Sequence, residues 1–262
     1  MIAIDSIIQG NCLEVMKDIE DKSIDLTVTS PPYDNLRDYK GYTFDFEPIA
    51  KELYRITKQG GVVVWVIGDQ TINGSETGTS FRQALYYKEI GFNLHDTMIY
   101  GKRCVPLNSN RYEPEFEYMF VFSKGKPLAF NPIQEKKLWK DNRTRKAMSR
   151  DKNGTHKIGF ASQKEDKISG NIWYYNIGGG HVTKDKEAYQ HPAIFPEALA
   201  RDHILSWSNE GHLVFDPMCG SGTTCKMAYK LNRHYLGCDI SQEYVNIAIK
   251  RLENEKAQLK LL

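Results

Sequence analysis

The chain has 262 residues, enough to bury one sizeable α/β core with an insertion, or two small domains. Its composition, 40% hydrophobic and 26% charged, excludes a disordered chain, and a net charge of +2 indicates no particular class of partner. Five cysteines without a Cys-x-x-Cys pair favour a reduced, cytoplasmic setting over a disulfide framework or a zinc site. We see neither a signal peptide nor an apolar run long enough to span a membrane.

Strand and helix patterns alternate along the first 130 residues. A short helix pattern follows Ile7 and Ile8, and the strand pattern IDLTVT (24–29) leads into Ser30-Pro31-Pro32-Tyr33. Ile49, Leu53 and Ile56 recur at helical spacing, and Gly60-Gly61 predicts the end of that helix. The apolar run 62–69 predicts a strand buried on both faces, and a helix with Ser80 as its cap and two further strands follow, at 94–100 and 117–125.

Residues 131–190 interrupt this alternation, and regular patterns return at 191–205, where Pro196 suits the first position of a helix. The strand at 212–216 then runs into a glycine turn, and the strand at 234–240 precedes a helix capped by Ser241. We therefore predict an α/β fold with a doubly wound, mostly parallel sheet, built from residues 1–130 and 191–262, with 131–190 as an insert. In such sheets ligands bind beyond the carboxyl ends of the strands.

The glycine turn is typical of a nucleoside site. Gly220 and Gly222 allow close approach of the backbone to a ligand, and the next helix begins near Thr223 with unpaired N–H groups. Asp239, at the end of the following strand, could accept hydrogen bonds from both ribose hydroxyls. Asp216 would repel a pyrophosphate and attract an ammonium, and Cys225 stands where a dinucleotide motif needs its third glycine. S-adenosylmethionine has a ribose and an ammonium and no phosphate, although a glycine corner without any ligand is the alternative.

The turn Ser30-Pro31-Pro32-Tyr33 suits methylation of an exocyclic amine. Such a nitrogen is a weak nucleophile until its geometry becomes tetrahedral, and hydrogen-bond acceptors placed at its two hydrogens favour that change. The Ser30 hydroxyl and the Pro31 carbonyl are two acceptors on a stiff loop, and Tyr33 offers a face for stacking a flipped base. The alternative is a strand ended by prolines, with a tyrosine that only packs.

Together, TSPPY and FDPMCGSGTT resemble the amino-methylating DNA methyltransferases over nearly the whole chain. Because the catalytic motif comes first and the cofactor motif last, the chain resembles the β group, a circular permutation of the usual Rossmann-like fold. The resemblance implies catalytic roles for Ser30, Pro31, Pro32 and Tyr33. It implies S-adenosylmethionine contacts from Asn11, Cys12, Phe195, Pro196, Glu197, Phe215, Asp216, Pro217, Gly220, Ser221, Gly222, Thr223 and Asp239. At Asn11 this chain departs from the family, which often has an acid there.

In that family, serine before Pro-Pro tends to accompany cytosine enzymes, whereas Asp or Asn tends to accompany adenine enzymes. We therefore expect transfer of a methyl group to N4 of a flipped-out cytosine in a specific DNA sequence. N6 of adenine is the alternative on the same fold.

Residues 136–157 hold nine Lys or Arg against two Asp, a local net charge of +7. The resemblance implies a target-recognition region at 131–190, so Lys136, Lys137, Arg143 and Arg145 are expected to bind phosphates of double-stranded DNA. A solvated basic loop is the alternative. Arg37 and Tyr39 could clamp DNA near the flipped nucleotide, or Arg37 could pair with Asp34 or Asp38. A cognate restriction endonuclease is an optional second partner.

Other activities fit the sequence less well. Methylation of cytosine at ring carbon 5 needs a cysteine, typically after a proline, and the chain has no Pro-Cys dipeptide. Methylation of RNA or of a protein glutamine uses a similar turn, but the basic insert and the permuted order favour DNA. A silent DNA-binding module would not need the intact motifs, and a nicotinamide-dependent oxidoreductase would need the missing glycine.

Overall fold

The computed structural model describes residues 2–33, 44–102, 111–136, 146–160, 166–178, 180–191, 193–194 and 196–259. The chain divides into two compact units: Met1–Asn131 with Asn171–Leu262, and Pro132–Gly170. The expected insert 131–190 thus contains the smaller unit and a further segment, 171–190, that belongs to the larger one. That segment lies with the larger unit because its strand β12 (Ile172–Tyr174) pairs with β6 (Asn93–Gly101). No helix in the described ranges is long and apolar enough to cross a lipid bilayer.

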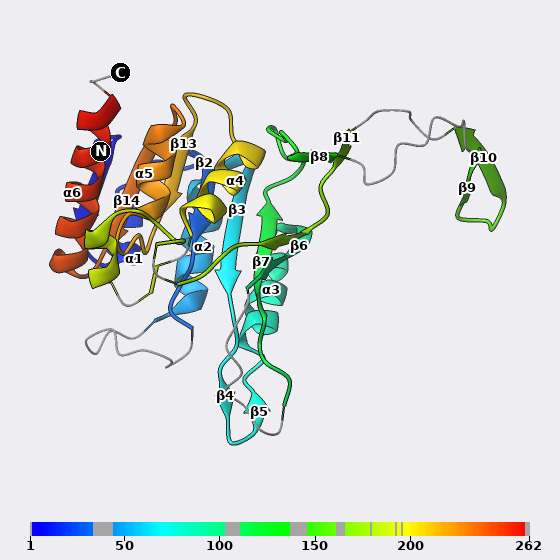
Figure 1. Cartoon of the computed structure of the whole chain (residues 1–262), viewed down its shortest axis with the longest axis horizontal. Helices are drawn as coiled ribbons and strands as arrows, with labels where there is room; N and C mark the ends of the chain where they lie inside the picture. The colour runs from blue at the N-terminus through cyan, green and yellow to red at the C-terminus, as the bar shows by residue number, and fades with distance from the viewer. Residues whose placement is uncertain are drawn as a thin grey trace. The chain divides into compact units, whose positions relative to one another are not determined.

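A central sheet organises the larger unit (Figure 1). Within the described residues its order is β1-β14-β13-β2-β3-β7-β6-β12. The remaining bounds are β1 (Ser6–Gln9), β14 (His234–Asp239), β13 (Leu213–Asp216), β2 (Ile24–Thr29), β3 (Thr57–Ile67) and β7 (Phe116–Ser123). All neighbours pair in parallel except β7, which is antiparallel to both β3 and β6. The predicted mostly parallel α/β sheet is confirmed.

Helices cover both faces of this sheet. One face packs against α1 (Cys12–Lys17), α2 (Phe46–Ile56) and α3 (Thr79–Glu89), and the other against α4 (Glu197–Trp207), α5 (Thr223–Lys230) and α6 (Gln242–Leu259). The alternation of side chains along β3 produces the two cores. Val63, Trp65 and Ile67 belong to the first, and Val62, Val64 and Val66 to the second. A continuous apolar run is therefore required in this strand.

Two expected helix ends differ in the structure. The helix of residues 46–56 stops at Ile56, four residues before the glycines, which belong instead to β3. Gly60 has φ +80°, its N–H donates to the Lys124 carbonyl, and a Cβ there would lie 2.3 Å from Leu128 Cγ. The glycines therefore serve strand pairing rather than helix termination. Helix α3 has Gly78 as its N-cap instead of Ser80, whose N–H and hydroxyl both donate to the Asp69 carboxylate.

The remaining short elements of the larger unit are the hairpin of β4 (Thr71–Ile72) and β5 (Ser75–Glu76) and the 3₁₀ helix η1 (Lys186–Gln190). In the part of the smaller unit that the structure describes, two antiparallel pairs occur: β8 (Gln134–Lys136) with β11 (Asp166–Ile168), and β9 (Lys146–Arg150) with β10 (His156–Phe160). The Asp151 carboxylate accepts hydrogen bonds from the N–H groups of Asn153 and Thr155 and so shapes the turn between β9 and β10.

Candidate active site

The sheet brings the two motifs together although they are far apart in sequence. Strands β2 and β13 are neighbours, with Leu26 opposite Val214 and Thr27 opposite Phe215. Thr29 Oγ1 donates to Asp216 Oδ1 at 2.7 Å, a buried bond between residues 187 positions apart. Thr224 Oγ1 donates to the Val28 carbonyl at 3.1 Å. The ends of the two strands are therefore fixed relative to each other.

A cavity of about 1030 Å³ lies at these carboxyl ends. Its walls include the whole turn Ser30-Pro31-Pro32-Tyr33. They also include other predicted residues, from the glycine turn, the end of β14 and the start of α1: Cys12, Pro217, Gly220, Ser221, Thr223 and Asp239. A volume of this size accommodates a cofactor beside a base. The predicted catalytic and cofactor motifs thus share one cavity.

The proline turn is linked by side chains to the antiparallel part of the sheet. Ser30 Oγ lies 3.0 Å from Tyr33 Oη, and Tyr33 Oη donates to Glu117 Oε2 at 2.8 Å. Lys102 Nζ in turn donates to Glu117 Oε1. Burial, followed by the Glu117 charge, raises the pKa of the Tyr33 phenol well above its usual value, so the hydroxyl keeps its proton.

Both glycines of the turn are needed for backbone geometry. Gly220 has φ +48° and Gly222 has φ +77°, in the left-handed region that favours glycine. A Cβ at Gly220 would lie 2.7 Å from His191 Nε2, and one at Gly222 would lie 2.6 Å from Ala248 Cβ. Gly220 therefore lines the cavity close to His191, whereas Gly222 lets α6 pack closely against the turn.

Asp239 lies at the end of β14 and lines the cavity. Its Oδ2 accepts from the Gly220 N–H and its Oδ1 from the Ser241 N–H, each at 2.9 Å. Each carboxylate oxygen has a second lone pair, so the group can also accept from a diol in the cavity. Burial raises the pKa of Asp239. The remaining acceptor capacity of this carboxylate fits the two hydroxyls of a ribose.

Asp216 does not face the cavity as the sequence suggested. Its side chain is buried, and Oδ1 accepts from Thr29 Oγ1 and from the Met218 N–H, the latter at 3.1 Å. Burial raises the pKa of Asp216 to about 6. The buried carboxylate thus connects the cofactor strand to the catalytic strand by hydrogen bonds.

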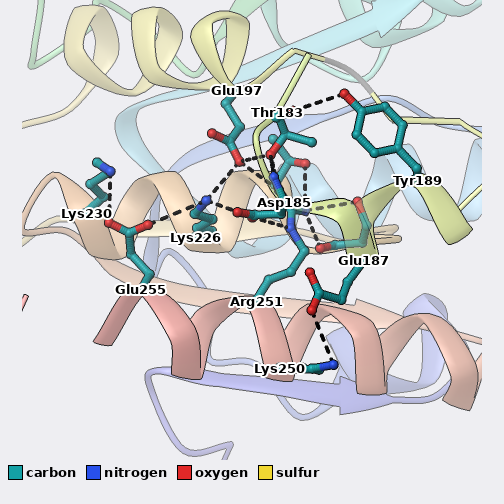
Figure 2. Close-up of polar contacts among 12 residues, drawn as sticks. Thr183, Asp185, Glu187, Tyr189, Glu197, Lys226, Lys230, Lys250, Arg251 and Glu255 are labelled. Carbon is teal, nitrogen blue, oxygen red and sulfur yellow. Dashed lines mark hydrogen bonds and ion pairs between the residues drawn. The ribbon is translucent and has the colours of Figure 1, made fainter. Parts of the chain in front are cut away.

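Glu197 also does not line the cavity. Its carboxylate forms ion pairs with Arg251 and Lys226. Arg251 of α6 is fully buried, and its guanidinium donates to Glu197 Oε1 at 2.8 Å, to Asp185 Oδ2 at 2.9 Å and to the Ser221 carbonyl at 2.6 Å. Lys226 Nζ lies 2.8 Å from Asp185 and 3.0 Å from Glu197 (Figure 2). This group of ion pairs is linked to the glycine turn by the hydrogen bond from Arg251 to the Ser221 carbonyl.

Four more predicted cofactor residues that the structure describes do not line the cavity: Asn11, Pro196, Phe215 and Gly222. Asn11 caps α1, since its Oδ1 accepts from the Leu13 N–H at 2.9 Å, and this places its neighbour Cys12 in the wall. Pro196 is the N-cap of α4, one position before the expected one. Phe195 lies outside the described residues.

Of the expected DNA-binding residues, the structure describes one. Arg37, Tyr39, Lys137, Arg143 and Arg145 lie outside the described residues, and Lys136 is exposed in β8 of the smaller unit.

Sequence reasoning missed several residues of the cavity wall: Tyr100, Lys102, Glu117, Ile177, His191 and Tyr244. Glu117 carried a signal, because it is an acid at the start of an apolar strand, and so did His191, because it begins the segment HPAIFP. Tyr100 and Lys102 reach the site through the pairing of β6 with β7, and Tyr244 through the packing of α6. Ile177 comes from the segment that follows β12.

Comparisons with known proteins agree with this geometry. A family model of N6 and N4 methyltransferases, described as DNA methylase, matches residues 24–250. The orphan methyltransferase M.BamHII of Bacillus amyloliquefaciens is 57% identical over 245 residues, which cover 91% of this chain and 92% of the relative. The solved structure of PvuII DNA methyltransferase (cytosine-N4-specific) has a TM-score of 0.68 at 20% identity, covering 96% of this chain and 90% of the other. That of M1.HpyAVI in complex with SAM has a TM-score of 0.61 at 22% identity, covering 94% and 99%.

Proposed function

The chain belongs to the N6/N4 family of DNA methylases, and we propose that it transfers a methyl group from S-adenosylmethionine to N4 of a flipped-out cytosine in a specific DNA sequence. The observation that carries this proposal is the single cavity lined both by Ser30-Pro31-Pro32-Tyr33 and by the glycine turn with Asp239. A methyl donor and an acceptor amine held in this cavity would lie side by side, as direct transfer of the methyl group requires.

The cofactor part of the cavity fits S-adenosylmethionine. Asp239 would accept hydrogen bonds from the ribose hydroxyls, and the turn from Pro217 to Ser221 together with Cys12 would enclose the nucleoside. When bound, S-adenosylmethionine would supply an activated methyl group on its sulfonium: the methyl carbon–sulfur bond breaks as the carbon–nitrogen bond forms, S-adenosylhomocysteine leaves, and the methylated amine releases one proton to solvent. Among the cavity residues, Asp239 is the one whose chemistry supports a nucleoside ligand most directly.

The catalytic part acts on the acceptor amine. The Ser30 hydroxyl and the Pro31 carbonyl accept hydrogen bonds from the two amine hydrogens, which draws the nitrogen lone pair out of conjugation as the geometry becomes tetrahedral. The prolines bring no competing N–H group, and the face of the Tyr33 ring stacks on the flipped base.

The choice of base rests on Ser30. Both amines need the same pair of acceptors, and serine before Pro-Pro supports cytosine N4 by resemblance within the family. A hydroxyl is a weaker acceptor than a carboxylate, so Ser30 lowers the activation barrier of methyl transfer by less than an Asp at this position would. Adenine N6 is the second candidate.

We propose that the substrate is double-stranded DNA, that the basic run 136–157 binds its phosphates, and that Arg37 and Tyr39 contact the DNA near the flipped nucleotide. We propose no fixed role for a restriction endonuclease, since the relative that is 57% identical is named an orphan methyltransferase. Such a partner would be sought by testing whether a nuclease cleaves the same DNA sequence and is blocked by methylation.

Transfer of radiolabel from S-adenosylmethionine to DNA tests the activity. We expect the wild type to label duplex DNA, and Ser30→Ala to bind the cofactor normally while its turnover falls about tenfold to a hundredfold. A folded wild type that binds the cofactor and labels RNA or protein but not DNA would contradict the proposal. A chain that binds DNA without transferring label would be the silent binding module.

A further inference from the structure

Four polar side chains form a continuous chain of contacts from the proline turn into the sheet: Ser30, Tyr33, Glu117 and Lys102. All four line the cavity. Glu117 stands near the start of β7, and Lys102 directly follows the end of β6, so the pairing of these two strands brings them together. The chain of contacts therefore depends on the antiparallel part of the sheet and not on the proline turn alone.

The direction of each hydrogen bond follows from the carboxylate. Glu117 accepts from Lys102 at one oxygen and from Tyr33 at the other, because an ionised carboxylate has no proton to donate. Tyr33 thus spends its only proton on Glu117, and its oxygen can only accept from Ser30. Ser30 must therefore be the donor across the 3.0 Å contact to Tyr33. Its proton then points away from the substrate, and its lone pairs are left for the amine.

We propose that Glu117 is a positioning residue which, through Tyr33, fixes the Ser30 hydroxyl as a hydrogen-bond acceptor for the target amine. The inference rests on the proposed function, because it concerns the same Ser30. It also suggests how the Ser30 hydroxyl, a weaker acceptor than a carboxylate, becomes a stronger one. Hydrogen bonds in a chain polarise one another, so a serine that donates toward a carboxylate accepts more strongly than an isolated one. Glu117 supplies at a distance part of what a carboxylate at position 30 would supply directly.

The position of the Tyr33 ring is compatible with this role. Its hydroxyl is held by Glu117, and its Cε2 would make an ordinary contact of 3.5 Å with a Cβ built on Gly68, just past the end of β3. The ring is thus held at its hydroxyl and packed close to the backbone of β3. Tyr33→Phe keeps the ring while it removes the hydroxyl that connects Ser30 to Glu117.

The substitution Glu117→Gln tests the direction of the chain. The introduced amide would turn its oxygen toward the Lys102 ammonium and its NH₂ toward Tyr33. Tyr33 would then accept at its oxygen and donate to Ser30, so Ser30 would lose acceptor capacity and point its proton toward the amine. We expect the kcat of label transfer to DNA to fall about tenfold or more, with KM for DNA and cofactor affinity unchanged.

A double-mutant cycle separates positioning from a structural role. If Glu117 acts through Tyr33, kcat in Tyr33→Phe combined with Glu117→Gln should be no lower than in the worse single variant. The matched control is Glu115→Gln, an exposed carboxylate on the same stretch of chain that does not line the cavity, and its kcat should equal that of the wild type. Thermal unfolding and calorimetric titration with S-adenosylmethionine verify that each variant is folded.

The outcomes distinguish this inference from the function on which it rests. If the wild type labels DNA and a folded Glu117→Gln variant does so at the same kcat, or if the two effects simply add, the inference is overturned and the function stands. If Glu117→Gln does not fold, Tyr33→Phe decides, because an unchanged kcat in that variant overturns the inference. If the wild type labels no DNA, both are overturned.

Discussion

Among single residues, we propose Asp239 as the one on which cofactor binding depends most directly. Its carboxylate lines the cavity and already organises the glycine turn through the Gly220 and Ser241 N–H groups. We expect Asp239→Ala to weaken S-adenosylmethionine binding by about 1.5–3 kcal/mol, as for hydrogen bonds to a charged group. Asp239→Asn, which keeps one oxygen, should lose less. Calorimetric titration of the folded variants measures both, and unchanged affinity in Asp239→Ala would refute this role.

Asp216 makes stability depend on pH. Burial raises its pKa from 3.8 to about 6, so the folded protein binds this proton more tightly than the unfolded chain does. The stabilisation is fully present below about pH 4 and is lost as the pH rises through about 6. Asp216→Asn keeps an oxygen for Thr29 and the Met218 N–H but does not titrate.

Denaturant unfolding of both proteins should show the consequence. The free energy of unfolding of Asp216→Asn, relative to wild type, should increase by an amount of the order of 3 kcal/mol between about pH 4 and about pH 7. A difference that does not vary with pH would mean that the native carboxyl titrates normally.

Sequence patterns located these residues better than they assigned their roles. Asp216 and Asp239 both stand at strand ends, yet only Asp239 lines the cavity, because Thr29 and the Met218 N–H take up the Asp216 carboxylate. Which strand end accepts a partner from the neighbouring strand depends on register and on the direction in which the side chain points. Neither is contained in a local motif.

Among the helices, α6 stabilises the glycine turn through a buried side chain. Its Arg251 donates to Glu197 of α4 and to Asp185 (Figure 2). The same guanidinium also donates to the Ser221 carbonyl. We expect Arg251→Met to lower the free energy of unfolding by about 3 kcal/mol, since the half-buried carboxylates of Glu197 and Asp185 lose a fully buried cation and the Ser221 carbonyl loses its donor. Urea unfolding measures this loss.

The matched control is Lys250→Met, which removes the neighbouring, exposed cation of the same helix. Lys250 Nζ lies 3.3 Å from Glu187 Oε1, with 61% of its side chain exposed, and its loss should change stability by less than about 0.5 kcal/mol. Equal effects of the two substitutions would contradict the supporting role of Arg251.

Element types were predicted more successfully than element ends. Strand β3 was predicted from its apolar run because burial on both faces requires one. From sequence alone Gly60 and Gly61 suggest a helix end, whereas both lie within β3, where the Gly60 N–H donates to the Lys124 carbonyl and the Gly61 carbonyl accepts from the Lys124 N–H. A glycine with positive φ satisfies either context locally, and only the partner strand decides between them.

In the whole molecule, the position of each motif directly after a strand predicts that both lie at the same edge of the sheet. In a parallel sheet the carboxyl ends of neighbouring strands meet at one edge, so β2 and β13 bring Ser30 and Gly220 to one cavity. DNA recognition could not be derived in this way, because it depends on side chains that read base edges and follow no periodic pattern.

The basic run nevertheless allows a prediction for the whole molecule. If residues 136–157 bind phosphates, DNA affinity should fall steeply with salt, and neutralising Lys136, Lys137, Arg143 and Arg145 together should flatten that slope. Cofactor affinity should show no such dependence. The control removes four exposed lysines of the larger unit: Lys17, Lys22, Lys51 and Lys88. Equal slopes for both quadruple variants would mean that the run is a solvated loop.

The central claim is that this chain methylates N4 of cytosine in DNA. Its most direct test is mass spectrometry of nucleosides digested from duplex DNA that has been incubated with the protein and S-adenosylmethionine carrying a labelled methyl group. We predict labelled N4-methylcytosine and no other labelled base, with about tenfold to a hundredfold less of it from the Ser30→Ala reaction over the same time. Labelled N6-methyladenine without N4-methylcytosine would contradict the claim.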